Sequence, residues 1–151
     1  MPELNLPVYD FKTRLADGKQ YIFDEIRKKY VVNTPEEWVR QNFIRYLINE
    51  KGYPGTLIGI EYEIRLNRLT KRCDAVVFSK KALPVMILEF KAPGVPVSQL
   101  VFDQIERYNK VLRVSYLLIT NGLKHYCCKI DPDKNNYVFL NEIPFYKDIE
   151  D

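Results

Sequence analysis

Two acidic residues and a lysine stand at a spacing that could hold a divalent cation between neighbouring segments. Asp74 lies in segment 72–79, which is rich in valine and phenylalanine. Glu89 and Lys91 close segment 84–91, which reads Pro-Val-Met-Ile-Leu before it turns charged. Both compositions are typical of β-strands, and because side chains alternate along a strand, Glu89 and Lys91 are expected to share one face.

A tight hairpin between these two segments would bring the acids together. If residues 80–83 form its turn, Ser79 pairs with Pro84. The same register then places Asp74 directly opposite Glu89, with their Cβ atoms about 5 Å apart. Two carboxylates at that distance repel each other unless a cation or a proton lies between them. Oxygen ligands on rigid strands suit Mg²⁺, which keeps several of its waters.

Lys91 extends this chemistry to phosphodiester hydrolysis. Its ammonium could stabilise the negative charge of the transition state or help to activate the attacking water. Cross-strand ion pairs are also common, so a purely structural cluster of charges stays open as an alternative. The apolar run before Glu89 favours catalysis, because it places the charges at the exit of a buried strand.

Two polar side chains lie on the apolar stripe of the next predicted helix, 98–112. This stripe repeats every four residues and comprises Leu100, Gln104, Tyr108 and Leu112. A glutamine on such a stripe needs hydrogen-bond partners, and a site at the strand ends would provide them.

At this point the residues resemble a known family. Three parts of the chain resemble the motifs of the PD-(D/E)XK nuclease superfamily. They are Asp74, Glu89-Phe-Lys91-Ala-Pro and Gln104-Ile-Glu-Arg-Tyr108. More narrowly, the chain resembles the N-terminal nuclease domain of type I restriction enzyme R subunits, with further similarity at 35–41 and 119–122.

The resemblance implies a role for each of these residues. Asp74 and Glu89 would hold Mg²⁺, with Mn²⁺ as a substitute, and Lys91 would be the catalytic lysine. Gln104 and Tyr108 would orient the site or the DNA backbone. The chain departs from the family in two ways: Cys73 replaces the proline before the aspartate, and the DNA-translocating motor of R subunits is missing. The second departure puts restriction itself in doubt, but not the nuclease fold.

The family usually places a further acidic residue on the first helix, near the metal. At about 100° per residue, Glu36 falls within the face formed by Val39 and Phe43, whereas Glu37 points away from it. Glu37 is also expected to act in a capping box with Thr34. We therefore expect Glu36 to be the third metal-binding carboxylate, with helix-start electrostatics as the alternative explanation.

The elements that must position these groups can be read from periodicity and turn residues. A first helix begins after Thr34, with Pro35 in its first turn, and ends at Gly52. A short lead-in is predicted before it: a strand over 9–14, a turn at Asp17-Gly18, a return strand over 20–23 and a helical turn over 24–30. Further strands are predicted at 57–66, 72–79, 84–91, 115–120, 123–130 and 137–140.

This order predicts an α/β fold with one mixed sheet flanked by helices. Helix 98–112 is expected to be a right-handed crossover between parallel strands. By resemblance, the fold is a restriction-endonuclease-like core with the order α-β-β-β-α-β-β. We expect residues 1–33 to form an N-terminal extension and residues 34–151 a single nuclease-like domain.

Composition narrows the class of protein. The chain has 151 residues and a net charge of +3, with 46% hydrophobic and 28% charged residues, as in ordinary globular domains. No apolar run is long enough to span a bilayer, and the start does not read as a secretory signal. Three cysteines, two of them adjacent, predict neither a disulfide framework nor a zinc site, so we expect a cytoplasmic location.

The leading interpretation is a Mg²⁺-dependent DNA endonuclease-like domain that acts through phosphate contacts, with a separate motor or restriction-system subunit as a candidate partner. The alternative is a catalytically weak or inactive module of the same fold that binds DNA or docks a subunit. His125, the only histidine, is expected at the surface or rim, and Trp38 is expected to pack against the lead-in.

Overall fold

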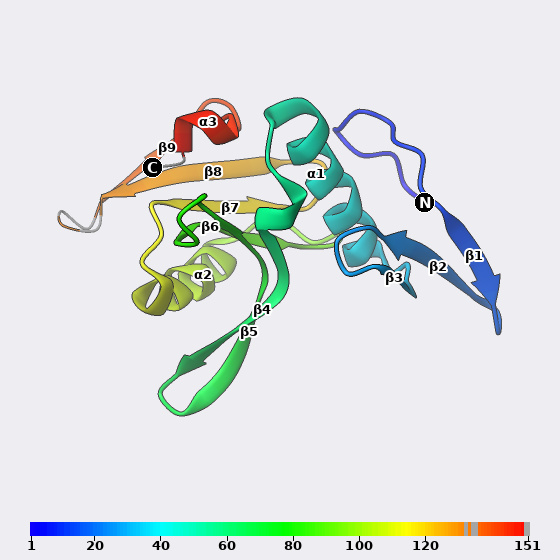
Figure 1. Ribbon diagram of the computed structural model, residues 1–151, viewed down its shortest axis with the longest axis horizontal. Helices are drawn as coiled ribbons and strands as arrows, with labels where there is room; N and C mark the ends of the chain where they lie inside the picture. The colour runs from blue at the N-terminus through cyan, green and yellow to red at the C-terminus, as the bar shows by residue number, and fades with distance from the viewer. Residues whose placement is uncertain (132, 134–135, 150–151) are drawn as a thin grey trace.

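A six-stranded mixed sheet lies at the centre of the molecule (Figure 1). The computed structural model describes residues 1–131, 133 and 136–149. Every neighbouring pair of strands is antiparallel except β6 and β7, which are parallel and joined through a helix. In sheet order the strands are β4 Ile58–Leu66, β5 Leu69–Phe78, β6 Pro84–Phe90, β7 Tyr116–Thr120, β8 His125–Asp131 and β9 Asn136–Phe139. The predicted α/β class and mixed sheet are therefore confirmed.

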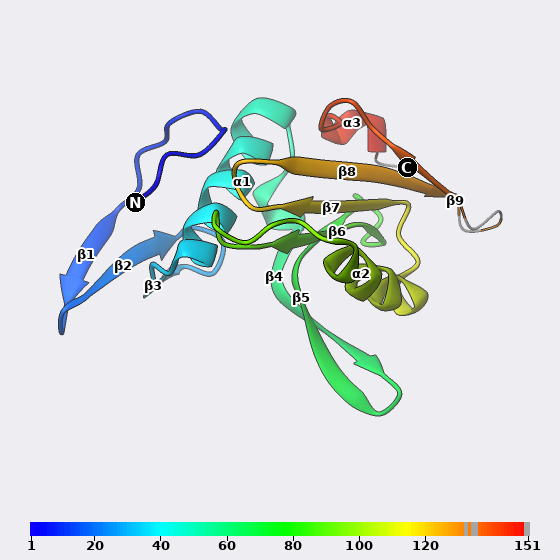
Figure 2. The ribbon, with the colours of Figure 1, turned by 180° about the vertical axis from the view of Figure 1, so that it is seen from behind.

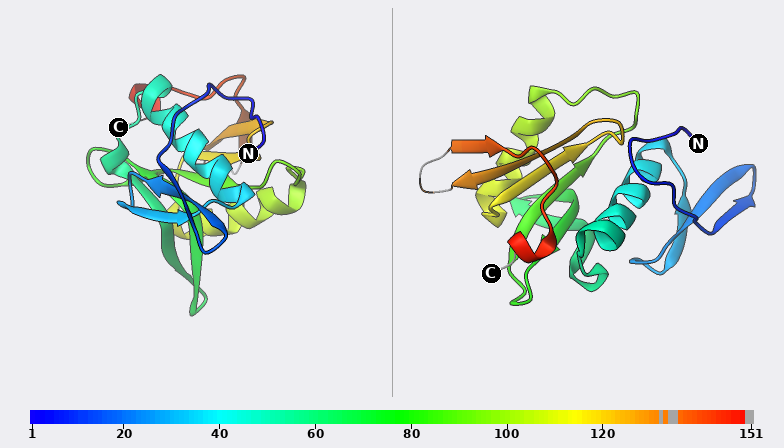
Figure 3. Two further views of the ribbon diagram at one scale, coloured as in Figure 1. Left: turned by 90° about the vertical axis from the view of Figure 1, so that its right-hand side faces the viewer. Right: turned by 90° about the horizontal axis from the view of Figure 1, so that it is seen from above.

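Two helices cover opposite faces of this sheet, α1 Pro35–Lys51 and α2 Gln99–Leu112 (Figures 2 and 3). Alternation along β6 explains the two layers. Leu88 and Phe90 pack in the cluster on the α1 side, whereas Ile87 packs on the α2 side. Burying both faces of β6 requires a nearly continuous apolar run, which is what its sequence provides.

The ends of α1 follow the predicted signals, with one exception. Thr34 Oγ1 accepts a hydrogen bond from the amide of Glu37 at 3.0 Å, and Gly52 ends the helix with φ 73°. The prediction that the Glu37 carboxylate completes a capping box with Thr34 was wrong. The amide of Thr34 donates to the carbonyl of Val32 at 3.0 Å, because the Glu37 carboxylate is bound by arginines instead.

A small three-stranded sheet precedes α1, and α1 lies between it and the main sheet (Figure 3). The predicted turn at Asp17-Gly18 is confirmed, with φ angles of 52° and 74°. The predicted helical turn at 24–30 was wrong in its second half, because 29–32 pairs as a strand with 21–24. The strands are β1 Thr13–Ala16, β2 Lys19–Asp24 and β3 Lys29–Val32.

Trp38 packs against the residues that precede β1, as expected. Its ring lies 5.7 Å from that of Phe11, and its Nε1 donates to the carbonyl of Pro2 at 3.0 Å. These contacts attach the start of the described chain to the first turn of α1.

Strand β4 lies within its predicted limits, whereas β5 begins at Leu69 instead of residue 72. They form a long hairpin whose outer part, residues 61–72, projects from the body of the molecule (Figure 1); we call this part the β4–β5 arm. Leu66 pairs with Leu69, so only Asn67 and Arg68 form the turn, both with positive φ (50° and 70°). This is the type I′ geometry that follows the twist of a hairpin.

The register between β5 and β6 follows the prediction except at the turn. Ala75 pairs with Leu88 and Val77 with Met86, as expected. The predicted pairing of Ser79 with Pro84 was wrong: Phe78 takes that place, and a β-bulge absorbs the difference. The cause is a tight turn in which the amide of Ser79 donates to the carbonyl of Leu83 at 2.8 Å.

The buried side of α2 differs in part from the predicted stripe. Tyr108 is buried and Leu112 packs on the same cluster, but Leu100 is 80% exposed. Ile105, which is fully buried, takes the central place. A period of 3.6 residues shifts a strict four-residue stripe around the helix, which explains the error at its first position.

Two further short elements complete the described chain. They are a 3₁₀ turn at Gly55–Leu57 and α3 Tyr146–Ile149, neither of which was predicted. None of the helices in the described part of the chain combines the length and the apolar character needed to cross a bilayer.

Candidate functional site

Asp74 and Glu89 lie on neighbouring strands and share one electrostatic environment. Asp74 lies directly beside the last regular pair of the β5–β6 ladder, Ala75 with Leu88. Its Oδ2 accepts a hydrogen bond from the amide of Phe90 at 2.8 Å. Glu89 is only 5% exposed. The charge of Asp74 acts on the carboxyl of Glu89. The hairpin therefore brings together the two acids that the spacing suggested.

The pair is poised to bind a proton or a cation. Burial, followed by the charges of Asp74 and Glu36, raises the pKa of Glu89 to about 8. Burial also raises the pKa of Asp74, against the lowering effects of the Phe90 amide, Arg40 and Lys91. Glu89 Oε2 is buried and has no hydrogen-bond partner among the described residues unless one carboxyl of the pair holds a proton.

Lys91 stands beside this pair on the predicted face. Its Nζ lies 3.6 Å from Glu89 Oε1, and its backbone amide donates to the carbonyl of Thr120 at 2.9 Å. The second bond extends the pairing of β6 with β7 by one residue and fixes the backbone of Lys91. A single ammonium faces two carboxylates, so the site keeps an excess of negative charge when both are ionised.

Glu36 lies close enough to this site for its charge to act there. Glu36 is exposed, in the first turn of α1. Its pKa is raised, first by partial loss of hydration and second by the charge of Asp74. In the described ranges, no three His, Cys, Asp or Glu side chains are placed to hold a metal ion together. Asp74 and Glu89 are the two carboxylates that could hold a cation here, with water or substrate completing its shell, and Glu36 as a third ligand stays a prediction.

The neighbouring Glu37 has a different role, in a buried network of ion pairs. Its carboxylate accepts hydrogen bonds from Arg40 Nη2 at 2.6 Å and from Arg27 Nη2 at 2.8 Å. These bonds overcome the effect of burial and lower the pKa of Glu37 to about 2. Arg40 also lies 3.4 Å from Glu61 Oε1 and acts on Asp74 through its charge.

Arg40 is the residue near the site that sequence reasoning missed. It lies one helical turn after Glu36 and is 8% exposed. A signal was present, because an arginine between the buried Val39 and Phe43 of an amphipathic helix needs a buried partner.

Gln104 and Tyr108 lie together on α2, and the Nε2 of Gln104 donates to the Tyr108 hydroxyl at 2.9 Å. Within the described part of the chain, no hydrogen bond joins either side chain to Asp74, Glu89 or Lys91. The partner that the half-buried amide of Gln104 needs is thus its own helix neighbour, Tyr108. A role for these two residues toward a substrate stays a prediction.

His125 is half-buried and braces the turn after β7. Its Nδ1 lies 2.7 Å from Thr120 Oγ1, its Nε2 lies 2.9 Å from the carbonyl of Asn5, and its ring lies 5.2 Å from that of Phe43. Burial lowers its pKa, so the ring stays neutral near pH 7. His125 thus links Asn5 of the N-terminal segment to Thr120, whose carbonyl accepts the hydrogen bond from the backbone amide of Lys91.

The cysteines are free and buried, in agreement with the prediction that they form no disulfide framework. Cys127 and Cys128 pack on opposite faces of the sheet. Cys73, which stands beside the candidate site, is inert as a nucleophile because burial raises the pKa of its thiol to about 12.

Comparisons with known proteins identify a family and a similar fold. Residues 35–144 match the family model described as "Type I restriction enzyme R protein N terminus (HSDR_N)". The fold is similar to the fragment structure of a putative HsdR subunit of a type I restriction enzyme from Vibrio vulnificus YJ016, with a TM-score of 0.52 and 19% sequence identity. That similarity covers 70% of this chain and 22% of the other, so the chain spans about a fifth of its structural relative. No curated protein matches the sequence.

Proposed function

Because this chain belongs to the family of type I restriction enzyme R protein N termini, we propose that it is a DNA endonuclease-like domain of the PD-(D/E)XK type. It hydrolyses phosphodiester bonds with Mg²⁺, and Mn²⁺ substitutes for it. The order of its elements from α1 to β8, α-β-β-β-α-β-β, supports a restriction-endonuclease-like core.

The observation that carries the proposal is the buried pair of carboxylates beside one lysine. Asp74 and Glu89 hold the cation, and Glu89 Oε2 has a lone pair that no described donor satisfies. When bound, Mg²⁺ supplies a Lewis acid for the phosphate and lowers the pKa of a coordinated water. Lys91, 3.6 Å from Glu89, places a positive charge where negative charge develops on the phosphate.

Nicking of supercoiled plasmid DNA tests the proposal. We expect nicking with Mg²⁺ or Mn²⁺, none with excess chelator, and none from Asp74→Ala or Lys91→Ala. Lys29→Ala is a matched control, because Lys29 is an exposed lysine of β3. Equal, weak activity in the wild type and in both site variants would show that the nicking is a contaminant and would overturn the proposal.

A second function is favoured by the pairing of Gln104 with Tyr108, because in the described part of the chain neither side chain is hydrogen-bonded to the acids or to Lys91. A domain of this size can serve a larger assembly by binding DNA or docking a motor or restriction-system subunit, with its catalytic residues retained but inefficient. Calorimetric titration with Mg²⁺ or Mn²⁺, followed by the nicking assay, separates the two functions. Metal binding without nicking favours the docking or DNA-binding module.

A further inference from the structure

The β4–β5 arm carries an isolated group of positive charges at its outer end. Arg65, Arg68 and Lys71 are all exposed, and residues 64–71 contain no acidic side chain. None of the three basic groups forms an ion pair with a described residue. The acids of the arm lie at its base instead, where Glu61 and Glu63 each pair with Arg72. The outer arm is thus a basic ribbon without internal neutralisation.

The base of the arm is anchored, so its direction is fixed by packing. Ile64 is 5% exposed and Cys73 is fully buried, and both lie in the cluster that contains Ile105 and Tyr108 of α2. Beyond these two anchors the ribbon leaves the body of the molecule (Figures 1 and 2). Its two-residue turn keeps it a regular antiparallel pair up to the tip.

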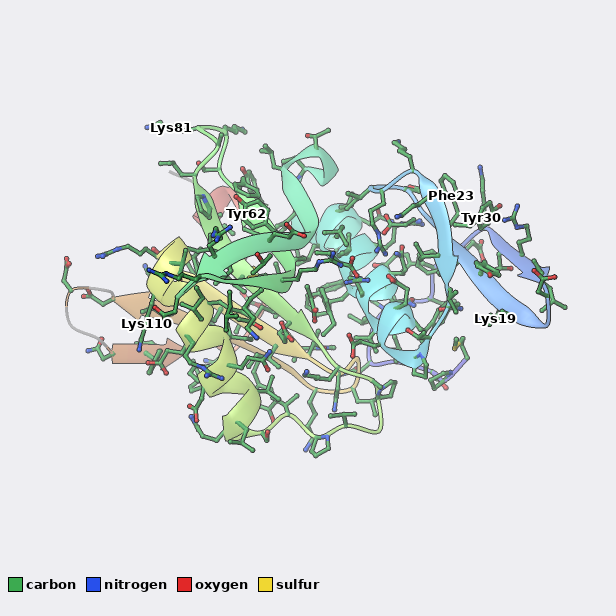
Figure 4. The ribbon with its side chains drawn as sticks, turned by 90° about the horizontal axis from the view of Figure 1, so that it is seen from below. Lys19, Phe23, Tyr30, Tyr62, Lys81 and Lys110 are labelled. Carbon is green, nitrogen blue, oxygen red and sulfur yellow. The ribbon has the colours of Figure 1, made fainter. Side chains whose placement is uncertain are left out.

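The arm and the candidate site belong to the same strand. Asp74 lies six positions after Arg68 at the tip, which corresponds to about 20 Å at the rise of a β-strand. A ligand that reaches both must therefore extend over this distance and carry negative charge. Tyr62 of the arm and Lys110, in the last turn of α2, are both labelled in Figure 4, which looks from the side on which the arm projects.

From this geometry we propose that the β4–β5 arm lies along the major groove of duplex DNA whose backbone passes the Asp74–Glu89 pair. This inference rests on the proposed function and adds the element that binds the duplex. The major groove is about 12 Å wide and admits a two-stranded β-ribbon. Arg65, Arg68 and Lys71 contact the phosphates that border the groove, and such contacts bind without selecting a sequence.

Binding without catalysis tests the arm directly. The probe is a fluorescein-labelled duplex of about 30 base pairs, followed by anisotropy in a metal-free buffer at several salt concentrations. A triple variant, Arg65→Gln, Arg68→Gln and Lys71→Gln, is compared with a control of equal charge change, Lys19→Gln, Lys28→Gln and Lys29→Gln. All six positions are exposed, so thermal melts are expected to match the wild type.

We expect the arm variant to bind the duplex at least about tenfold more weakly near physiological salt, and the slope of log K against log salt to fall by about two to three. The control keeps most of the wild-type slope. A single-stranded probe of the same length, which has no groove, loses less affinity than the duplex. Arg68→Glu at the tip gives a second, independent loss without a multiple substitution.

Two results would overturn the arm inference: equal weakening in the arm variant and its control, or equal loss on single-stranded and duplex probes. Either result leaves the proposed function intact if the wild type still nicks plasmid and Lys91→Ala does not. A wild type that binds duplex through the arm but never nicks supports the arm and refutes the nuclease activity. Absence of any DNA binding refutes both.

Discussion

Asp74 is hydrogen-bonded to the backbone of Phe90, the residue that separates Glu89 from Lys91 in sequence. The 2.8 Å bond joins the carboxylate of β5 to the amide of β6, at the point where the regular ladder between these strands ends. The spacing between the acid pair and the lysine is therefore set by the strands themselves. A cation would enter a site that is already assembled, which is how rigid elements favour catalysis.

Asp74→Asn separates the charge of this residue from its structural bond. The asparagine Oδ1 can still accept from the amide of Phe90, so we expect the free energy of unfolding to change by less than about 1 kcal/mol. Plasmid nicking should nevertheless fall at least about a hundredfold, because an amide is a poor ligand for Mg²⁺. Denaturant unfolding and the nicking assay measure the two effects.

Asp74→Ala is the comparison, because it leaves the Phe90 amide without its acceptor. We expect it to cost about 1–2 kcal/mol of stability in addition to the activity. If Asp74→Asn destabilised the protein as much as Asp74→Ala, the bond to Phe90 would not be the structural role of this residue.

Stability without metal should fall as the pH rises, because Glu89 is held in its neutral form. The pKa of Glu89 is raised from 4.5 to about 8, so between these values the folded protein binds more protons than the unfolded chain. The contribution is complete below about pH 4.5 and is lost as the pH rises through about 8, with an upper bound of about 5 kcal/mol. Urea unfolding at pH 5, 7 and 8.5 in chelator would measure it.

Mg²⁺ should reverse this trend. A cation between the carboxylates replaces the proton, so millimolar Mg²⁺ is expected to raise the melting temperature at pH 8 and to have little effect at pH 5. Glu89→Gln removes both the proton and the ligand and is expected to abolish the pH dependence and the Mg²⁺ effect. A pH–stability curve in the wild type that did not respond to divalent metal would favour the purely structural cluster of charges.

The sequence predicted the acid pair because its geometry depends on local rules. A short hairpin fixes a register, and the register held from Ala75 to Val77 although the turn itself differed by a bulge. Helix α1 could also be predicted from the sequence, because Thr34, Pro35 and Gly52 are local signals of its two ends. The error at Leu100 arose from a period of four where the helix has 3.6.

The features that sequence reasoning missed depend on contacts between distant segments. Arg27 and Glu37 are ten positions apart in the chain. They form a hydrogen bond only because the N-terminal sheet packs against α1. The start of β5 was missed because the turn before it, Asn67-Arg68, lacks the glycine that marks a type I′ hairpin. An arginine at φ 70° is disfavoured locally and is held there by the ladder on either side.

Ala82→Gly should stabilise the protein. Ala82 lies in the β5–β6 turn with φ 63°, a left-handed conformation that costs a residue with a Cβ about 1 kcal/mol and costs glycine almost nothing. The greater freedom of glycine in the unfolded chain offsets part of the gain, so we expect about 0.5 kcal/mol. Thermal unfolding at one pH measures it, and Ala92→Gly, outside the left-handed region, is expected to be neutral or destabilising.

Substitution of the two adjacent glutamates of α1 should affect the stability of the protein to very different extents. Glu37→Ala leaves Arg40 buried without its main partner, so we expect a loss of about 3 kcal/mol in the free energy of unfolding. The pKa of Glu37 is lowered from 4.5 to about 2, so its contribution is present above about pH 4.5 and is lost as the pH falls toward 2. Acid unfolding of the wild type should show this loss, and Glu37→Ala should not.

Glu36→Gln should leave stability within about 0.5 kcal/mol, because the side chain is exposed. Its effect belongs to the site: removing the charge of Glu36 lowers the pKa of Glu89 and weakens the attraction for a cation. We expect calorimetry to show Mg²⁺ binding severalfold weaker than in the wild type. Unchanged Mg²⁺ affinity in Glu36→Gln would reduce Glu36 to a favourable charge at the start of the helix and leave the cation with two protein ligands.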